Sequence, residues 1–160
     1  MGGEAPQTNM KITSPSGDEF QLVVVGYQHP DLHEDRWDSN WLLVNGSVTA
    51  AGEKWAFTDP CVTTFELADF AEWFDELADD GTQPSSFAFT EPNLKFTFTP
   101  WPHPAIQLTL TQESAPPSLP DPDRARGVTV EFPMPPSKTM ALAAEIRRIL
   151  MDYPIRGGAA

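Results

Sequence analysis

The stretch DPCVTTFELADFAEWFDELADDG, residues 59–81, carries local signals that predict a helix. Thr63 and Glu66 have the spacing of a capping box. In this motif the threonine oxygen accepts from the Glu66 backbone N–H, and the Glu66 carboxylate accepts from the Thr63 N–H. Val62 and Leu67 occupy the positions of the matching hydrophobic staple. Together these signals predict a helix that starts just after Thr63.

Turn signals mark both ends of this helix. The residue before a proline is disfavoured in the helical region, so Asp59-Pro60 predicts a turn that leads into the helix. Gly81 predicts the left-handed residue that commonly ends a helix. We therefore expect the helix to run from about Thr64 to Asp80.

The predicted helix has one apolar and one acidic face. At about 100° per residue, its apolar side chains gather on one face: Leu67, Phe70, Ala71, Trp73, Phe74, Leu77 and Ala78. Its carboxylates gather on the other: Asp69, Glu72, Asp75, Glu76, Asp79 and Asp80. The apolar face is typical of a helix packed on a core.

The acidic face is unusual for a helix exposed to solvent. Such helices commonly alternate charges at i,i+4, where each attractive pair is worth about 0.2–0.5 kcal/mol, whereas Glu72/Glu76 and Glu76/Asp80 repel. The macrodipole also disfavours anions at a helix C-terminus, and no lysine or arginine occurs between Lys54 and Lys95. Two explanations stay open: a solvated face of an acidic protein, or a docking surface for a cationic partner.

Length and charge indicate a single acidic globular domain. A chain of 160 residues, 40% of them hydrophobic, is long enough to bury about 70% of its unfolded surface. The formal net charge of −13 argues against binding nucleic acid or an anionic membrane and favours a basic protein partner. We expect residues 1–18 to be disordered and residues 19–157 to form one domain.

The sequence predicts a cytoplasmic protein without a cofactor. A single cysteine, Cys61, has no partner for an internal disulfide. The first residues lack the apolar stretch of a signal peptide, and no run approaches the roughly 18 apolar residues of a membrane span. Walker, G-x-G-x-x-G, G-x-S-x-G and H-E-x-x-H motifs are all missing from the sequence.

The remaining segments predict strands joined by turns, followed by a second helix. Runs of alternating apolar, β-branched and aromatic residues predict strands near residues 20–28, 41–49, 54–58, 87–89, 94–98, 105–113 and 128–132. Ser137 is expected to cap a helix from about Lys138 to Asp152, which Pro154 ends. We expect an α+β fold: a twisted, mainly antiparallel sheet of six or seven strands with two helices packed on one face.

Residues with metal-binding or catalytic chemistry are few. His29 and His33, followed by Glu34 and Asp35, are metal-ligand types at i,i+4 spacing. The turn-like context with Pro30 argues against a helix there, and no further cysteine or histidine joins the group. We therefore expect no metal site.

The candidate nucleophile and acid–base pair have ordinary explanations. Cys61 precedes a helix start, where a thiol pKa can fall, but its apolar neighbours indicate a buried, inert thiol. Glu91 and Glu113 resemble a glycosidase pair if their strands are neighbours, yet an acidic β protein offers such pairs by chance. We expect no catalytic residues. A hydrolase stays open as an alternative, to be tested by loss of activity on Glu91→Gln.

Five tryptophans are many for this length. Trp41, Trp55 and Trp73 lie in strand or helix contexts that predict burial. Trp37 lies in a polar loop among acidic residues, and Trp101 lies between prolines. Each is either an exposed aromatic anchor for a partner or a side chain folded back over a strand.

Several segments, taken in order, resemble one known family. They are VVVGYQHP (23–30), DSNWLLV (38–44), WAFTDPCVTTFEL (55–67), FTEPNLKF (89–96) and YPIRG (153–157). The chain is similar over these stretches to the WapI family of bacterial immunity proteins. The family has a Glu-x-x-Pro-Pro-Trp segment after the long strand, where this chain reads ESAPPSL (113–119) without the tryptophan. No interface role is carried over to that segment.

The resemblance implies a small cytosolic protein without enzyme activity. It would bind and neutralise the toxic C-terminal domain of a contact-delivered WapA-type toxin, typically an RNase. Nucleases that bind a phosphate backbone are basic, so we expect the acidic helix face, with Trp37 and Trp101, to contribute to the toxin-binding surface. The loops at 30–40 and 114–126 and the concave side of the sheet stay open as contacts. The alternative is an adaptor that binds a basic partner unrelated to toxins.

Overall fold

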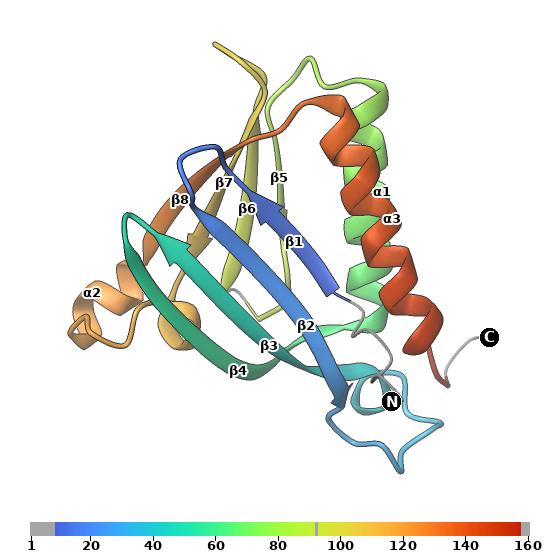
Figure 1. Ribbon diagram of the computed structural model, residues 1–160. Coiled ribbons are helices and arrows are strands. Elements are labelled where there is room, and N and C mark those ends of the chain that lie inside the picture. The colour runs from blue at the N-terminus through green and yellow to red at the C-terminus, as the bar shows by residue number, and fades with distance from the viewer. Residues whose placement is uncertain (1–8, 92, 158–160) are drawn as a thin grey trace, which may run out of the picture.

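The computed structural model describes residues 9–91 and 93–157. In chain order its elements are β1 (Asn9–Thr13), β2 (Glu19–Tyr27), η1 (Asp38–Asn40), β3 (Trp41–Ala50), β4 (Glu53–Thr63), α1 (Thr64–Asp79), β5 (Ser85–Ala88), β6 (Leu94–Thr99), β7 (Ala105–Leu110), η2 (Gln112–Ser114), α2 (Asp121–Arg126), β8 (Val128–Pro133) and α3 (Pro136–Asp152). Within these residues the strands form two four-stranded antiparallel sheets, ordered β1-β2-β3-β4 and β5-β6-β7-β8 (Figure 1).

This architecture corrects the predicted fold. The expected single sheet of six or seven strands with two helices is wrong, because the described residues contain eight strands in two sheets and three α-helices. Each sheet is a meander of strands that follow one another in sequence, and α1 separates the two meanders. Alternating burial shows that a strand has one buried face, but it does not show which strands share a sheet.

The inner faces of the two sheets pack on each other and form the core. Phe20 of β2 contacts Phe96 of β6 across the gap, with ring centroids 6.2 Å apart, and Leu42 and Leu108 are completely buried. Helices α1 and α3 lie side by side along one side of the sheets, and α2 lies on the opposite side (Figure 1). The concave side of the sheet, one of the open contact surfaces, is therefore filled by core side chains.

Helix α1 forms as its local signals predict, with one exception at its end. The capping box is present, with Thr63 and Glu66 each accepting from the other's backbone N–H. Phe70 lies at the centre of an aromatic cluster with Phe74, Phe87 and Phe96. The prediction of a left-handed Gly81 is wrong, since its φ is not positive. A Cβ at Gly81 would lie 2.7 Å from the Leu77 carbonyl oxygen, so the absence of a side chain is what the site requires.

The predicted turn at Asp59-Pro60 lies inside strand β4. This strand is the edge of its sheet, where a proline removes no inner hydrogen bond. The register against β3 also shifts between the pairs Leu42–Val62 and Val44–Asp59, which is a β-bulge at the proline. Strand β4 ends at Thr63, and α1 follows directly at Thr64 without a loop.

Strand β1 lies in the segment expected to be disordered, so that expectation is wrong for residues 9–13; residues 1–8 lie outside the described part. As an edge strand, β1 has backbone groups that face away from β2 and need partners. The Lys11 N–H donates to Glu145 Oε1 at 3.0 Å, and Lys138 Nζ donates to the Thr13 carbonyl at 3.0 Å. Helix α3 therefore covers this edge.

Three boundaries in the second half also differ from prediction. Helix α3 begins at Pro136, and Ser137 does not cap it; proline suits the first helical position because no N–H is needed there. Strand β7 ends at Leu110, since Gln112 takes a positive φ of 52° and starts η2. The charged loop at 114–126 contains α2.

Candidate functional site

Five of the six carboxylates on the acidic helix face are exposed to solvent. They are Asp69, Glu72, Glu76, Asp79 and Asp80. Asp75 is half-buried and forms an ion pair with Arg147 of α3, and this hydrogen-bonded carboxylate raises the pKa of the Arg147 guanidinium. The acidic face is therefore largely open to a partner and is neutralised by α3 along one margin.

The exposed carboxylates continue from the first turn of α1. Phe65, Asp69, Glu72 and Glu76 follow one another at i+4, i+3 and i+4, so their side chains line up along one stripe of the helix. Trp37 covers the start of this stripe: its ring meets the Phe65 ring edge to face, with centroids 5.0 Å apart. We call these four residues of α1 the acidic stripe.

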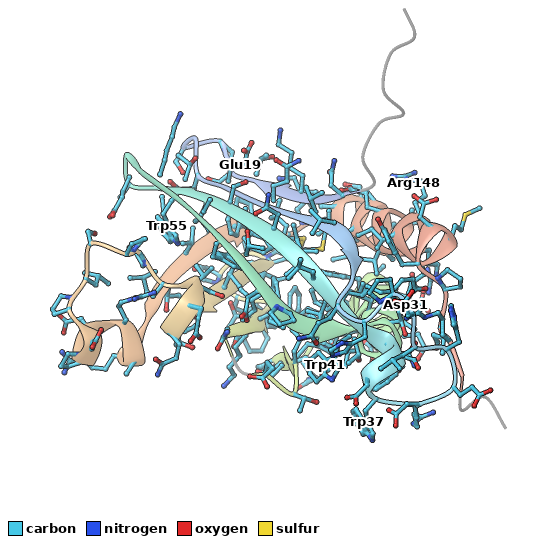
Figure 2. All side chains as sticks on the ribbon, turned by 90° about the horizontal axis from the view of Figure 1, so that it is seen from below. Glu19, Asp31, Trp37, Trp41, Trp55 and Arg148 are labelled. Atoms are coloured by element: carbon cyan, nitrogen blue, oxygen red, sulfur yellow. The ribbon has the colours of Figure 1, made fainter. Side chains whose placement is uncertain are left out.

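Trp37 is held by a long connection between β2 and β3, residues 28–40, which we call the β2–β3 loop. The Asp35 carboxylate accepts from the backbone N–H groups of Trp37 and Asp38 at 2.8 and 2.7 Å, and the Arg36 guanidinium lies 5.0 Å from the Phe65 ring centroid. Trp37 remains 51% exposed and projects from the loop (Figure 2).

Arg156 from the C-terminal tail holds the β2–β3 loop through hydrogen bonds to its backbone. Its guanidinium donates to the backbone carbonyls of Ser39, Pro30 and His29 at 3.0, 3.0 and 2.9 Å. The same group lies 3.6 Å from the ring centroid of Tyr27, which is a cation–π contact. One side chain therefore joins the end of β2, the loop and the tail.

Buried Asn40 adds further hydrogen bonds between the same segments. We call Arg156 and Asn40, with their hydrogen bonds, the Arg156–Asn40 lock. Asn40 is 1% exposed, and its amide nitrogen donates to the carbonyls of Arg36 and Arg156, both at 2.8 Å. Its amide oxygen accepts from the Arg156 N–H and from Thr64 Oγ1 at 2.8 and 2.6 Å. Because a buried amide with all its groups bonded fixes each partner's position, the loop, the tail and the start of α1 form one rigid unit.

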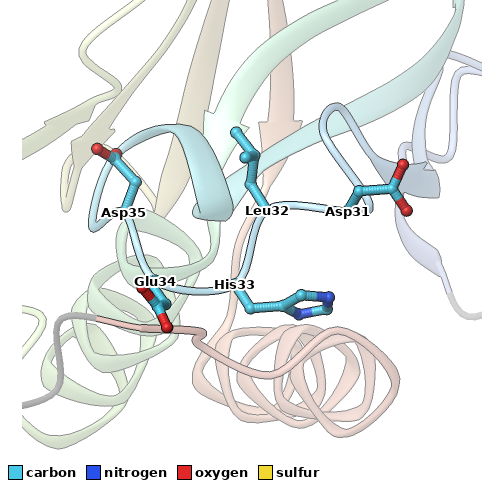
Figure 3. Close-up of a pocket in the computed structure, with 5 residues that line it drawn as sticks. All are labelled: Asp31, Leu32, His33, Glu34 and Asp35. Carbon is cyan, nitrogen blue, oxygen red and sulfur yellow. The ribbon is translucent and has the colours of Figure 1, made fainter.

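The β2–β3 loop is strongly acidic. Asp31, Leu32, His33, Glu34 and Asp35 line an open depression of about 600 Å³. The side chains of Asp31, Glu34 and Asp35 point away from one another rather than toward a common point (Figure 3). Among the described residues, no three or more His, Cys, Asp and Glu side chains are arranged to hold a metal ion.

Trp101 belongs to a loop that reaches the other end of α1. It is 77% exposed on the β6–β7 loop, residues 100–104, which reaches the opposite end of the molecule from the β2–β3 loop (Figure 1). Pro104 of this loop lines a hollow of about 150 Å³ together with Asp79, Asp80 and Phe98. Since α1 rises about 1.5 Å per residue, its two ends are roughly 24 Å apart. The structure does not bring Trp37 and Trp101 together.

A second polar cluster joins β4 to the turn after β5. The buried Asn93 amide donates to Asp59 Oδ2 at 3.0 Å and to Glu113 Oε2 at 3.3 Å. Burial raises the pKa of Asp59, and Glu113 and Glu91 raise it further, while the Asn93 hydrogen bond opposes them. Glu91 and Glu113 therefore both act on Asp59, and the amide that joins two of these carboxylates holds the turn to the sheet.

The thiol of Cys61 is inert. It is 1% exposed, and burial, assisted by the nearby Asp59, raises its pKa to about 12. A thiol with this pKa is protonated at neutral pH and is a poor nucleophile. Cys61 is a core residue of β4.

Sequence reasoning missed Arg156 and Asn40, the two side chains that organise the loop. Both lie within segments that carry the family resemblance, YPIRG and DSNWLLV. The sequence did not indicate what these two side chains do. The signal available was an arginine just after a helix-ending proline and an asparagine just before a strand. Neither pattern shows that two segments more than a hundred residues apart meet.

Comparison with known proteins identifies one family. The family model described as the immunity protein WapI-like family matches residues 11–154. No curated protein and no solved structure matches the chain. Within the described residues, no helix is long and apolar enough to cross a membrane.

Proposed function

Because the chain belongs to the WapI-like family of immunity proteins, with a toxin protein as the partner that this family implies, we propose that it binds and neutralises the toxic C-terminal domain of a cognate WapA-type toxin. The proposed toxin is contact-delivered, and its toxic domain is a basic nuclease. Neutralisation occurs in the cytoplasm by binding alone, without a cofactor. Family membership is the observation that carries this proposal.

The charge of the molecule supports a basic toxin domain. The chain has a formal net charge of −13, and four exposed acidic residues of α1, together with Asp80 at its C-cap, lie on one side of the helix. A nuclease gathers lysine and arginine to bind a phosphate backbone. An acidic surface attracts such a groove over a distance and accelerates association. The proposed contact surface is the acidic face of α1, from Asp69 to Asp80.

The two exposed tryptophans are the candidates for an apolar anchor within this contact. Trp37 lies at the start of α1, and Trp101 belongs to the loop whose Pro104 lines the hollow at the other end of the helix. Tryptophan is among the residues that most often dominate binding energy at interfaces. Their separation makes each separately testable.

Neutralisation tests the function directly. The toxin domain used is the C-terminal domain of the large secreted protein encoded beside this gene, co-expressed with this chain in a sensitive host. Restored growth, together with stoichiometric inhibition of nuclease activity by the purified chain, is the expected result. A chain that neither binds nor rescues would refute the immunity function and leave the adaptor explanation, as would the lack of any such neighbouring gene.

Charge reversal tests the contact surface. Replacing Glu72→Lys and Glu76→Lys together should slow association at least tenfold and flatten its salt dependence, since attraction between exposed charges is screened over about 10 Å at 0.1 M salt. The control reverses Asp121 and Glu131, exposed acids of α2 and β8, with the same change in net charge. If both double variants slow association equally, overall charge acts and the α1 face is only solvated.

A further inference from the structure

We propose that the β2–β3 loop is the anchoring contact for a basic segment of the toxin domain, with Trp37 as the apolar anchor. Arg156 is the positioning residue that holds this loop in its binding conformation. The inference rests on the proposed function and adds to it where the tightest contact lies and which residue prepares it.

The loop is far longer than the connection of two paired strands requires. Tyr27 of β2 pairs with Leu42 of β3, and strands paired in this way are usually joined by about two to five residues. Here residues 28–40 intervene, and the only regular structure within them is the short η1. Loops of this length inside a compact domain are usually either functional or disordered segments, and this one is held in place by Arg156.

The exposed chemistry of the loop fits a cationic protein segment. Trp37 and Leu32 are 51% and 42% exposed. The same loop carries four carboxylates, Asp31, Glu34, Asp35 and Asp38, against the single arginine Arg36. An aromatic centre bordered by polar groups is the common anatomy of an interface. The face of an indole ring also attracts lysine and arginine through a cation–π interaction, so both features favour a basic occupant.

The loop is held rigid although it is exposed. Residues 28–38 are all exposed, yet Arg156 bonds three of the loop's backbone carbonyls, and Asn40 ties the loop to the tail and to Thr64. Gly157 follows with φ of +57°, and a Cβ there would lie 2.5 Å from the His33 carbonyl oxygen. A loop that is already ordered loses less entropy when it binds, which increases affinity.

The loop is continuous with the acidic stripe. Trp37 and Arg36 both contact Phe65 in the first turn of α1, and Asp69 lies one turn further along. A basic groove attracted by the stripe is therefore brought next to Trp37. Attraction along the helix and anchoring at the loop involve neighbouring parts of one surface.

Binding kinetics of single variants test the anchor. The toxin domain is immobilised, and association and dissociation of the chain are measured by surface plasmon resonance. Trp37→Ala should raise Kd at least tenfold, mainly through faster dissociation. Trp101→Ala, which removes the alternative anchor, should change Kd less than twofold, and Met151→Ala, at an exposed apolar residue of α3, is the matched control. An unchanged Kd for Trp37→Ala, or equal losses for both tryptophan variants, would overturn the proposal.

A double variant tests the positioning role of Arg156. Arg156→Ala should raise Kd about fivefold in the otherwise unchanged chain. In the Trp37→Ala background it should raise Kd less than twofold, because the side chain that Arg156 positions has already been removed. Arg148→Ala, an exposed arginine on α3, should leave Kd unchanged. Circular dichroism and thermal unfolding of each variant first establish a temperature at which it is fully folded. Binding is then measured at that temperature. A full, additive loss from Arg156→Ala in both backgrounds would show that it does not act through Trp37.

The same experiments separate the two proposals. If the unaltered chain neither binds nor rescues, the immunity function falls and the loop inference falls with it. If it binds and rescues while Trp37→Ala and Arg156→Ala bind normally, the function stands and only the loop inference is overturned.

Discussion

The two loops at the ends of helix α1 each present an exposed tryptophan, but they are built differently. The β2–β3 loop carries Trp37, which packs on Phe65, and its backbone is held by the Arg156–Asn40 lock. The β6–β7 loop carries Trp101, which is more exposed, and is tied to the chain after β8 through a hydrogen bond from the Met134 N–H to the Pro104 carbonyl. Exposure alone would favour Trp101 as the anchor.

The difference shows why support matters more than exposure for an interface. A freely rotating side chain loses rotamer entropy on binding, about 0.5–1.5 kcal/mol for one immobilised group. Trp37 has already lost much of this freedom to its contact with Phe65, and its loop is ordered by buried hydrogen bonds. The less exposed tryptophan is therefore the better prepared to bind.

Asn40→Ala should have the largest effect on this comparison. It leaves buried carbonyl and N–H groups without partners, each costing about 1–3 kcal/mol, so we expect a loss of about 2–4 kcal/mol in the free energy of unfolding, measured in urea. Asn45→Ala, at an exposed asparagine of β3 whose side chain accepts one solvent-exposed hydrogen bond from Thr58 Oγ1, should cost less than about 0.5 kcal/mol. A similar small cost at both positions would mean that the lock does not stabilise the loop.

Arg156→Ala should have the next largest effect. Loss of its hydrogen bonds and its contact with Tyr27 should lower the free energy of unfolding by about 1–2 kcal/mol. Hydrogen exchange should accelerate most in residues 29–38. Residues 100–104 should exchange as before, and Arg148→Ala should reproduce neither change. Uniform acceleration across both loops would contradict a local lock.

The tryptophans themselves should differ modestly in stability. Trp37→Ala removes the edge-to-face contact with Phe65, a type of contact worth about 0.5–1.5 kcal/mol, and should lower the free energy of unfolding by about 1 kcal/mol. Trp101→Ala should change it by less than about 0.5 kcal/mol. Thermal and urea unfolding of the two variants measure this difference, and a larger cost at Trp101 would reverse the comparison.

The smallest expected effect on stability concerns the carboxylate of Asp59 in β4. The pKa of Asp59 is raised above its ordinary value of 3.8, so the folded chain binds this proton more tightly than the unfolded chain. The contribution of Asp59 to stability is therefore full below about pH 3.8 and is lost as the pH rises through the folded-state pKa. Asp59→Asn keeps an acceptor for Asn93 and should raise the melting temperature at pH 7.

The pH dependence checks this assignment. The stabilisation by Asp59→Asn should shrink as the pH falls toward 4, because the wild-type carboxyl then becomes neutral as well. A variant that is less stable at pH 7, or equally stabilised at both pH values, would show that burial of the charged Asp59 carboxylate and its repulsion by Glu113 and Glu91 do not lower stability. Glu131→Gln, at an exposed position on β8, is the matched control.

Local signals predicted local structure well. The capping box at Thr63 and Glu66, the acidic and apolar faces of α1 and the turn at Ala51-Gly52, with φ of 52° and 83°, all follow from residues close in sequence. Propensity and capping act over a few residues, so they can be read from a single segment.

Features that depend on distant segments were not predictable in this way. Two meanders and one larger sheet have the same strand pattern in the sequence, and the strand pairing that distinguishes them depends on contacts between distant segments, such as Phe20 with Phe96. The sequence around Pro60 predicts a turn, whereas the structure accommodates this proline in a bulge of the edge strand β4. The Arg156–Asn40 lock joins the tail to the loop over more than a hundred residues, so the acidic residues of the candidate surface were identified and its organising residues were not.

The most direct test of the account is the footprint of the toxin domain on this chain, measured by hydrogen exchange in the free and bound states. The account predicts slower exchange at residues 29–38 and along α1, with residues 100–104 and 114–126 unchanged. Protection confined to residues 100–104 or 114–126 would contradict it. The contact would then lie at the other end of α1 or on the opposite side of the molecule.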